Sequence, residues 1–296
     1  MEYSEDLLEK TKRLLDILDA LGHAPATQRR LSLCGGTALN LLRSRRTPRL
    51  SEDLDFNFRY NGRVDWGIVR QETEDELKNI IQRLGYDMQM LRIQPLYNQG
   101  RFYLRYHNSA GHIDLIKIEI GYMRRFPILR RDSLVKVPEH GTSRVMTPTV
   151  EELYANKFCT MFSRMRRRPN ARDVFDVATI SKRRFRRSLF VDVVMLETLL
   201  MNLDHGNMRF LGLEKRAHRE LSNLAGQQID IEGIAEDAET FSKDVLEEIH
   251  SCGIPVFQET FKQTGSIKLE MLHHPELINH HIAQHPQLLW LRQRKK

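Results

Sequence analysis

LSLCGGTALNLLRSRRTPRLSEDLDFNF, residues 31–58, is the stretch of sequence that decides the fold. It opens with an apolar run that ends in Gly35-Gly36, and the residues that follow, 37–42, favour a helix. After a basic loop over 43–49, apolar residues alternate with Asp53 and Asp55, which predicts a strand with one apolar and one polar face. The predicted order is therefore strand, glycine pair, helix, loop and strand.

Outside this stretch, the patterns are mixed at first and helical later. Apolar residues at helical spacing cover 7–21 and 65–84, and strand patterns cover 88–93, 101–106 and 113–120. Further helices are predicted over 149–165 and 172–180, and helical patterns dominate from Ser188 onward. We therefore predict an α+β fold: a domain over 1–145 with a mixed sheet and flanking helices, then a mainly helical domain over 146–296.

The composition is that of a globular protein, with 41% hydrophobic and 29% charged residues in a chain of 296. Its formal net charge of +7 favours contact with polyanions. The three cysteines form no Cys-x-x-Cys pair, which argues against a disulfide framework or a cysteine zinc site and favours the cytoplasm. No apolar run is long enough to span a bilayer, so we expect no membrane partner.

Asp53 and Asp55 are the residues on which the predicted chemistry depends. Because they are two apart on a strand, their carboxylates leave the same face, and two like charges that close need a neutralising partner. Mg²⁺ can supply it by binding carboxylate and phosphate oxygens together. Gly35-Gly36, ahead of a helix, offers backbone N–H groups to a phosphate. An Asp-x-Asp pair alone is common on edge strands, but the whole order of motifs is much rarer by chance and indicates nucleotidyl transfer.

Two blocks of sequence resemble a known family. The first block is Leu33-Cys34-Gly35-Gly36-Thr37-Ala38-Leu39 with Arg49-Leu50-Ser51-Glu52-Asp53-Leu54-Asp55-Phe56, and the second is Glu151-Glu152-Leu153-Tyr154-Ala155-Asn156-Lys157 with Arg172-Asp173-Val174-Phe175-Asp176-Val177. Both are similar to the signature of the AbiEii/AbiGii nucleotidyltransferase toxins, which belong to the DNA polymerase β-like nucleotidyltransferase superfamily. The resemblance covers residues 30–180 and implies a sheet of the nucleotidyltransferase type.

The resemblance implies roles for individual residues. Asp53 and Asp55 would bind the metal, Mg²⁺ or alternatively Mn²⁺. The residues that would contact the substrate NTP are Gly35, Gly36, Thr37, Arg49, Ser51 and Arg172. Lys157 would reach the phosphates, and Asp173 would complete the catalytic set, for example by orienting Lys157. Asp176 lies three positions further on the same helix face and could fill that role instead, although we favour Asp173. The alternative for Lys157 is a surface lysine whose head reaches solvent.

A third metal-binding carboxylate is usual in this superfamily and would lie on a neighbouring strand. Asp114 and Glu119 are the candidates in the strand predicted over 113–120, and strand periodicity puts them on opposite faces. Asp114 shares its face with isoleucines, whereas Glu119 shares its face with Lys117. We choose Glu119, because the string Lys117-Ile118-Glu119-Ile120 looks more like the family's strand. Either carboxylate could instead be a cross-strand ion-pair partner.

Two clusters of basic residues flank the motifs. The residues in them are Arg43, Arg45, Arg46 and Arg49 in the first, and Arg164, Arg166, Arg167, Arg168, Arg172, Lys182, Arg183, Arg184, Arg186 and Arg187 in the second. Charge runs are usually solvated faces, but an RNA acceptor would need such clusters. Five histidines between His273 and His285 are interpreted as surface residues, because no acidic or cysteine partner stands at zinc-binding spacing.

The sequence thus favours a Mg²⁺-dependent nucleotidyltransferase that moves a nucleotide from an NTP to an acceptor hydroxyl, with tRNA the favoured acceptor. The resemblance implies the toxin of a toxin–antitoxin or phage-defence pair, with a cognate antitoxin as partner. A protein or small-molecule acceptor is the first alternative. The arginine clusters argue against a small cationic acceptor, which would need an acidic cleft. A catalytically inactive RNA-binding module is the second alternative.

Overall fold

The computed structural model divides into two compact units, which are described separately. The first unit holds Glu2–Pro127 and Asp132–Pro148, and the second holds Ile128–Arg131 and Thr149–Lys296. The residues that the structure describes are 3–43, 49–165, 170–203, 221 and 230–293. The segment 128–131 thus belongs with the later part of the chain.

A seven-stranded mixed sheet forms the centre of the first unit, in the order β3-β4-β5-β2-β1-β7-β6. Its strands are β1 (Leu31–Cys34), β2 (Asp53–Phe58), β3 (Arg92–Pro95), β4 (Gln99–His107), β5 (Ile113–Gly121), β6 (Ser133–Lys136) and β7 (Arg144–Thr147). The pairs β2–β5 and β1–β7 are parallel, and the other neighbours are antiparallel. The sheet confirms the α+β class.

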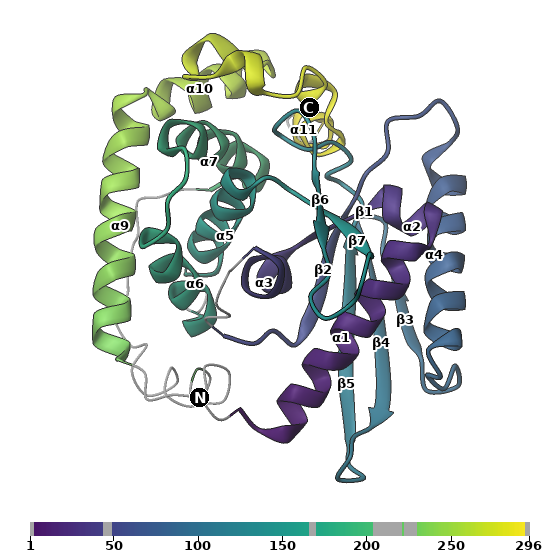
Figure 1. The fold of residues 1–296 in the computed structure, drawn as a ribbon. Helices are drawn as coiled ribbons and strands as arrows, with labels where there is room; N and C mark the ends of the chain where they lie inside the picture. Colours follow the sequence, from purple (N-terminus) through teal and green to yellow (C-terminus); the bar gives the residue numbers. More distant parts are fainter. Residues whose placement is uncertain (1–2, 44–48, 166–169, 204–220, 222–229, 294–296) are drawn as a thin grey trace. The chain divides into compact units, whose positions relative to one another are not determined.

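Three helices lie on one side of this sheet, as Figure 1 shows: α1 (Glu5–His23), α2 (Pro25–Arg30) and α4 (Trp66–Arg83). They cover an apolar sheet face, because Leu54, Phe56 and Phe58 of β2 are buried while the residues between them are half-exposed. A short helical segment follows β1. It consists of α3 (Gly35–Thr37) and a π-helical turn over Ala38–Leu42. The polar face of β2 is therefore the accessible one.

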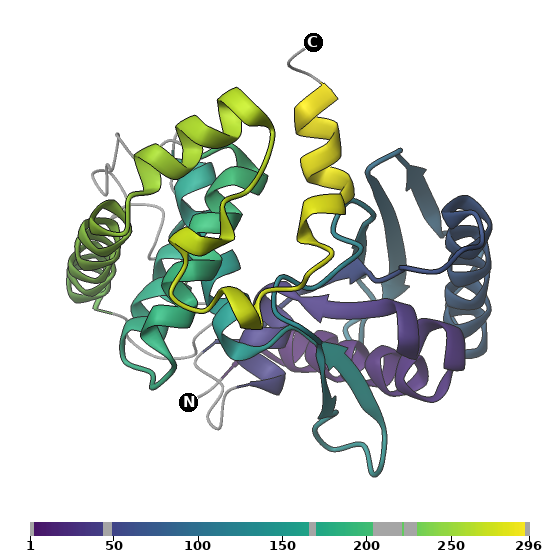
Figure 2. The same ribbon diagram turned by 90° about the horizontal axis from the view of Figure 1, so that it is seen from above.

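The second unit is helical, as expected from the sequence. Among the residues that the structure describes, its α-helices are α5 (Val150–Met165), α6 (Ala171–Ser181), α7 (Arg187–Met201), α9 (Ile231–Ser251), α10 (Ile254–Thr264) and α11 (Pro286–Gln293) (Figure 2). The rings of Phe158, Phe190 and Phe241 pack within 5.9–6.1 Å of one another at the centre of α5, α7 and α9. Helix α7 is buried from Leu189 to Leu200, as expected of a helix that is apolar on most sides.

Buried carboxylates attach the irregular segments to the second unit. Glu152 Oε2 accepts hydrogen bonds of 3.1 Å from the backbone N–H groups of Ile128 and Leu129. Asp192, fully buried in α7, accepts bonds of 2.8 Å from the N–H groups of His273 and His274. These bonds satisfy backbone donors that would otherwise be costly to bury, and they hold segments far apart in sequence together.

Some sequence expectations differ from the structure. The strand predicted over 88–93 is wrong in position, because Gly85 at φ +83° and a turn at Asp87 occupy the region before β3. Helix α2 and strands β6 and β7 were not predicted; each has only four to six residues, too few for a periodic pattern. His285 is fully buried and not a surface residue.

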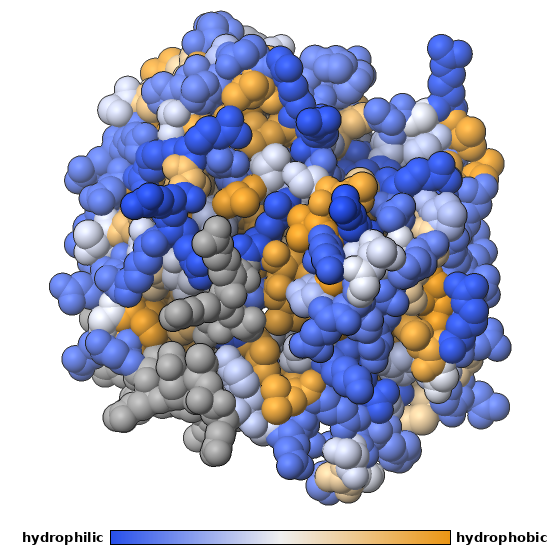
Figure 3. All heavy atoms as spheres, in the orientation of Figure 1, coloured by the Kyte–Doolittle hydropathy of each residue, from blue (hydrophilic) through white to orange (hydrophobic). Residues whose placement is uncertain are grey.

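The surface is polar over most of the face drawn in Figure 3, where apolar residues appear in small groups among hydrophilic ones. Among the residues that the structure describes, no helix is both long and apolar enough to cross a membrane.

Candidate active site

The pairing of β2 with β5 assembles a cluster of charged residues on the accessible sheet face. In the parallel register, Asp53 stands opposite Lys117 and Asp55 stands opposite Glu119. All four side chains leave the same face, because the alternate residues of both strands are buried. Glu119 therefore lies beside the aspartate pair, on the face that the sequence predicted for it.

Asp114, the alternative carboxylate, lies on the opposite face of β5. Its carboxylate is 2.8 Å from Lys10 Nζ of α1 and accepts a 2.8 Å hydrogen bond from Tyr106 Oη. Burial alone would raise the pKa of Asp114, but Lys10, the Leu115 N–H group and the Tyr106 hydroxyl together hold it below its usual value. Asp114 thus links α1 to the sheet and stands apart from Asp53 and Asp55.

Lys117 is the residue that sequence reasoning passed over. Its Nζ lies 3.4 Å from Asp53 Oδ2 and also contacts Glu119 Oε2. Burial alone would lower the pKa of Lys117, but the hydrogen bond to Glu119 and the charges of Asp53, Glu119 and Asp55 together raise it. The repulsion expected between the carboxylates is therefore offset by an ammonium group of the chain itself.

Glu119 has two further partners besides Lys117. Gln99 Nε2 donates a 2.6 Å hydrogen bond to Glu119 Oε1, and Arg101 Nε donates one of 2.9 Å to the same oxygen. Burial opposes the ionisation of Glu119, but Lys117 and Arg101 outweigh it and hold its pKa below the usual value. Both oxygens of Glu119 are thus engaged by donors of the chain.

The glycine pair lies directly against this cluster. Gly35 has φ +68°, and a Cβ there would come within 3.0 Å of both Cβ and Cγ of Asp55. A Cβ on Gly36 would lie 3.0 Å from Arg49 Nη2 and 3.1 Å from Ser51 Oγ. The glycines are therefore needed for close approach, and they bring together the predicted phosphate-binding residues of the first block.

Thr37 is a positioning residue in this arrangement. It is buried, and its Oγ1 lies 2.9 Å from Ser51 Oγ and also contacts the backbone oxygen of Asp53. The hydroxyl thus joins the helical segment after β1 to the start of β2. The contact of Thr37 with the substrate stays a prediction. Arg49 is also buried, and its Nη1 donates a 3.1 Å bond to Leu50 O.

In the second unit, Lys157 forms a buried ion pair with Asp176. The distance from Nζ to Oδ2 is 2.9 Å, and the side chains are 9% and 0% exposed, so Lys157 is not the solvent-reaching surface lysine of the alternative interpretation. Asp173, which the sequence analysis favoured as the partner of Lys157, instead accepts a 2.8 Å bond from Arg164 Nη1. Asp176 is therefore the residue that orients Lys157.

The predicted basic clusters are described only in part. Arg45, Arg46, Arg166, Arg167 and Arg168 lie outside the described residues. In the first cluster, Arg43 donates a 2.8 Å bond to Pro148 O. In the second, four cations are in ion pairs: Arg164 with Asp173, Lys182 with Asp237, Arg186 with Glu151 and Arg187 with Glu248. Arg172 is the second residue of α6, and its N–H group donates a 2.9 Å hydrogen bond to Asn170 Oδ1. Four cations of the second cluster thus already have a carboxylate partner within the helical unit.

Asp53 and Asp55 fit a divalent cation better than Glu119 does. Their carboxylates share one accessible face and supply hard oxygen ligands, to which substrate phosphates could add. In the part of the chain that the structure describes, no three His, Cys, Asp or Glu side chains converge on one point. Metal binding by Glu119 stays a prediction, and it would require the release of at least one of its present donors.

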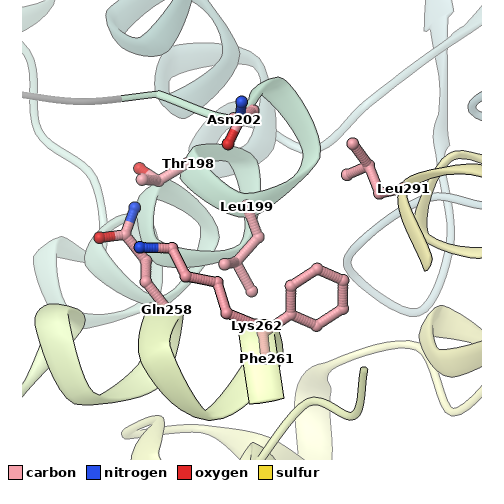
Figure 4. Close-up of a pocket in the computed structure, with 7 residues that line it drawn as sticks. All are labelled: Thr198, Leu199, Asn202, Gln258, Phe261, Lys262 and Leu291. Carbon is pink, nitrogen blue, oxygen red and sulfur yellow. The ribbon is translucent and has the colours of Figure 1, made fainter. Parts of the chain in front are cut away.

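A separate pocket of about 340 Å³ lies in the second unit, between α7, α10 and α11 (Figure 4). Its lining residues are Thr198, Leu199, Asn202, Gln258, Phe261, Lys262 and Leu291. None of the residues that the sequence analysis assigned to the site lines this pocket.

Comparison with known proteins gives a family match over most of the chain. The model of a family described as "Nucleotidyl transferase AbiEii toxin, Type IV TA system" matches residues 16–263. Among solved structures, MenT4, a nucleotidyltransferase toxin from Mycobacterium tuberculosis H37Rv, is 17% identical with a TM-score of 0.46, covering 83% of this chain and 93% of its own. An antigenic nucleotidyltransferase-like protein from Paracoccidioides brasiliensis is 17% identical with a TM-score of 0.38, covering 60% and 77%. No curated protein matches.

Proposed function

The chain belongs to the AbiEii family of nucleotidyltransferase toxins, and from this premise we propose that it transfers a nucleotide from an NTP to an acceptor hydroxyl on RNA, with tRNA the favoured acceptor. The observation that carries the proposal is the placement of Asp53 and Asp55 on an accessible sheet face, against the Gly35-Gly36 turn. Carboxylates beside a glycine turn at the start of a helical segment suit a nucleoside triphosphate and its counter-cation.

Residues of the first unit would have different roles in this reaction. Asp53 and Asp55 would hold Mg²⁺ or Mn²⁺, which when bound neutralises phosphate charge and activates the attacking hydroxyl. Gly35 and Gly36 allow the triphosphate to approach the backbone, and Ser51 presents a hydroxyl beside them. Thr37 keeps Ser51 and the start of β2 in register.

Lys157 would supply positive charge to the phosphates, oriented by its 2.9 Å ion pair with Asp176. Its buried position supports this role, since an ion pair with so little solvent around it has a fixed geometry. The part assigned to Asp173 is then to hold Arg164. Arg49 and Arg172 remain candidates for substrate contacts.

The proposal extends to the biological setting. We propose that the chain acts in the cytoplasm as the toxin of a toxin–antitoxin or phage-defence pair and that it has a cognate antitoxin; the family's description as a toxin of a type IV toxin–antitoxin system supports this partner. Such a setting supplies both NTP and tRNA, which are the two substrates that the proposal requires.

A labelling experiment tests the function. The purified protein is incubated with total tRNA and each α-labelled NTP in turn, with Mg²⁺ present, and labelled RNA is resolved on a gel. We expect one NTP to label RNA. Asp53→Ala should reduce the rate of labelling at least 1,000-fold, which corresponds to an activation barrier about 4 kcal/mol higher, because it removes one of the two proposed metal ligands. Asp114→Asn is the matched control, because it changes an acidic residue on the other face of β5. Undiminished labelling by Asp53→Ala would overturn the mechanism.

A further inference from the structure

An aromatic platform lies on the first unit and has no role in the site described above. We define it as Trp66, Tyr97 and Arg125. The rings of Trp66 and Tyr97 meet edge to face with centroids 5.7 Å apart, and the Arg125 guanidinium stacks over Trp66 at 4.0 Å. These residues come from three separate segments: the start of α4, the β3–β4 turn and the loop after β5. Sequence spacing therefore gave no sign of them.

A second layer supports the platform from beneath. The guanidinium of Arg70 stacks over the ring of Tyr122 at 3.9 Å and pairs with Glu74 at 2.7 Å, and Tyr122 Oη contacts the same carboxylate. The ring of Tyr122 lies 6.3 Å from that of Trp66. Because each polar group of this layer has a partner, the outer rings rest on a fixed base.

The outer layer carries one positive charge and is partly open to solvent. Tyr97 is 69% exposed, whereas Trp66 and Arg125 are half-buried. Arg125 has no ion pair with any described residue; its Nε donates to Tyr122 O at 3.2 Å, and its half-burial lowers its pKa despite the nearby charge of Asp65. Asp65 Oδ1 is itself engaged, since it accepts a 2.7 Å bond from Gly67 N at the start of α4. A partly desolvated guanidinium that has no carboxylate in direct contact is costly, and an anion bound to it would reduce that cost.

The platform lies close to the carboxylate site in sequence but is not on the same face of the sheet. Gln99, which bonds to Glu119, is two residues from Tyr97, and the loop that carries Arg125 follows the end of β5. Trp66 begins α4, which covers the apolar face, whereas Asp53 and Asp55 lie on the polar face. The platform would therefore hold a part of the RNA other than the end that reacts.

From these observations we infer that the platform binds a single-stranded segment of the acceptor RNA. A base stacks on Tyr97 and Trp66, and the adjoining phosphate meets Arg125, which combines the two features by which proteins hold single strands. This inference rests on the proposed function and specifies its acceptor class. A protein partner could also use exposed rings, but the guanidinium without an ion pair at their centre favours a polyanion.

Tryptophan fluorescence tests the inference, because the chain has only two tryptophans, Trp66 and Trp290. Trp290→Phe leaves Trp66 as the only tryptophan reporter. A short single-stranded oligoadenylate carrying a dye is titrated without Mg²⁺ or NTP, and its anisotropy and the Trp66 emission are recorded together. We expect binding to quench Trp66, with the same midpoint in both signals, and a duplex of equal length to quench far less.

Substitutions distinguish the contribution of ring stacking to the affinity from that of net charge. Tyr97→Ala and Arg125→Gln should each raise Kd about tenfold, whereas Tyr97→Phe should bind as the parent does because its ring remains. Arg29→Gln, at an exposed arginine of α2, is the charge-matched control for Arg125→Gln and should change Kd less than twofold. Thermal unfolding checks that each variant is folded.

Two results would overturn the inference: unquenched Trp66 at saturating anisotropy, or parental affinity in both Tyr97→Ala and Arg125→Gln. Either result would leave the proposed transferase activity intact, because binding is measured without catalysis. Failure of the Asp53→Ala labelling test would instead remove the proposed function and leave the binding data standing.

Discussion

Lys117 neutralises a carboxylate cluster that would otherwise repel itself, so removing its charge should weaken the first unit. Lys117→Met keeps an unbranched apolar side chain as far as Cε and deletes the ammonium that lies 3.4 Å from Asp53 and contacts Glu119. A hydrogen bond to a charged group contributes about 1.5–3 kcal/mol, and the lysine side chain is 29% exposed, so we expect a loss of about 2 kcal/mol. For a unit of this size, that loss lowers Tm by roughly 4–8 °C.

Magnesium should restore part of this loss. Without the lysine, the aspartate pair is left with fewer neutralising groups, and a divalent cation becomes the better partner. At ten times its Kd, Mg²⁺ would return about 1.4 kcal/mol. Mg²⁺ should stabilise the parent protein less, because the ammonium of Lys117 already lies beside the carboxylates. Thermal unfolding with and without Mg²⁺ measures both effects independently of catalysis.

Lys10→Met is the matched control for this experiment. Lys10 makes a 2.8 Å ion pair with Asp114 of the same strand, but on the face that α1 covers. The substitution should lower Tm, and Mg²⁺ should not restore it. If Lys117→Met melts with the parent, or if Mg²⁺ stabilises both variants equally, the neutralising role of Lys117 is refuted.

Three further predictions follow from single contacts. Gly35→Ala should destabilise the protein by about 1–3 kcal/mol in denaturant titrations and abolish RNA labelling, because the positive φ and the closeness of Asp55 both exclude a side chain. Asp176→Ala should cost about 3–5 kcal/mol by leaving Lys157 buried without its partner, and an unchanged denaturation midpoint would contradict that pairing. The pKa of Asp114 is lower in the folded protein than in the unfolded chain, so its ionised carboxylate stabilises the fold at pH values above the unfolded pKa. This stabilisation disappears as the pH falls through the folded pKa. Asp114→Asn should therefore flatten the acid side of a Tm–pH profile.

The face of each site residue could be predicted from the sequence, because strand periodicity is a local property. Alternation alone placed Asp53 and Asp55 on one face and separated Glu119 from Asp114. Periodicity does not determine which strands are neighbours, however. That β5 pairs with β2, and that Lys117 then stands opposite Asp53, depends on the topology of the whole sheet.

The partner of Lys157 shows the same limit in a helix. Asp173 and Asp176 are three residues apart and share a helix face, so spacing could not distinguish them. The choice depends on how α5 packs against α6, which brings Asp176 to Lys157 and leaves Asp173 to Arg164. A residue's chemistry can be predicted from its type and motif, but its partner is fixed by packing between elements.

The chain's own cations explain how this carboxylate face can remain accessible. An accessible face keeps water near Asp53 and Asp55, which lowers the cost of their charges, yet Glu119 is only 16% exposed and needs compensation from Lys117 and Arg101. Asp53, Asp55 and Glu119 are fixed to strands, so their carboxylates cannot move away from one another when no cation is bound between them. A lysine with a flexible stem can both neutralise them and withdraw when a nucleotide and its counter-cation arrive. An arginine, with its rigid planar fork, would withdraw from the carboxylates less readily than Lys117. Lys117→Arg should therefore preserve stability while weakening the response of Tm to Mg²⁺.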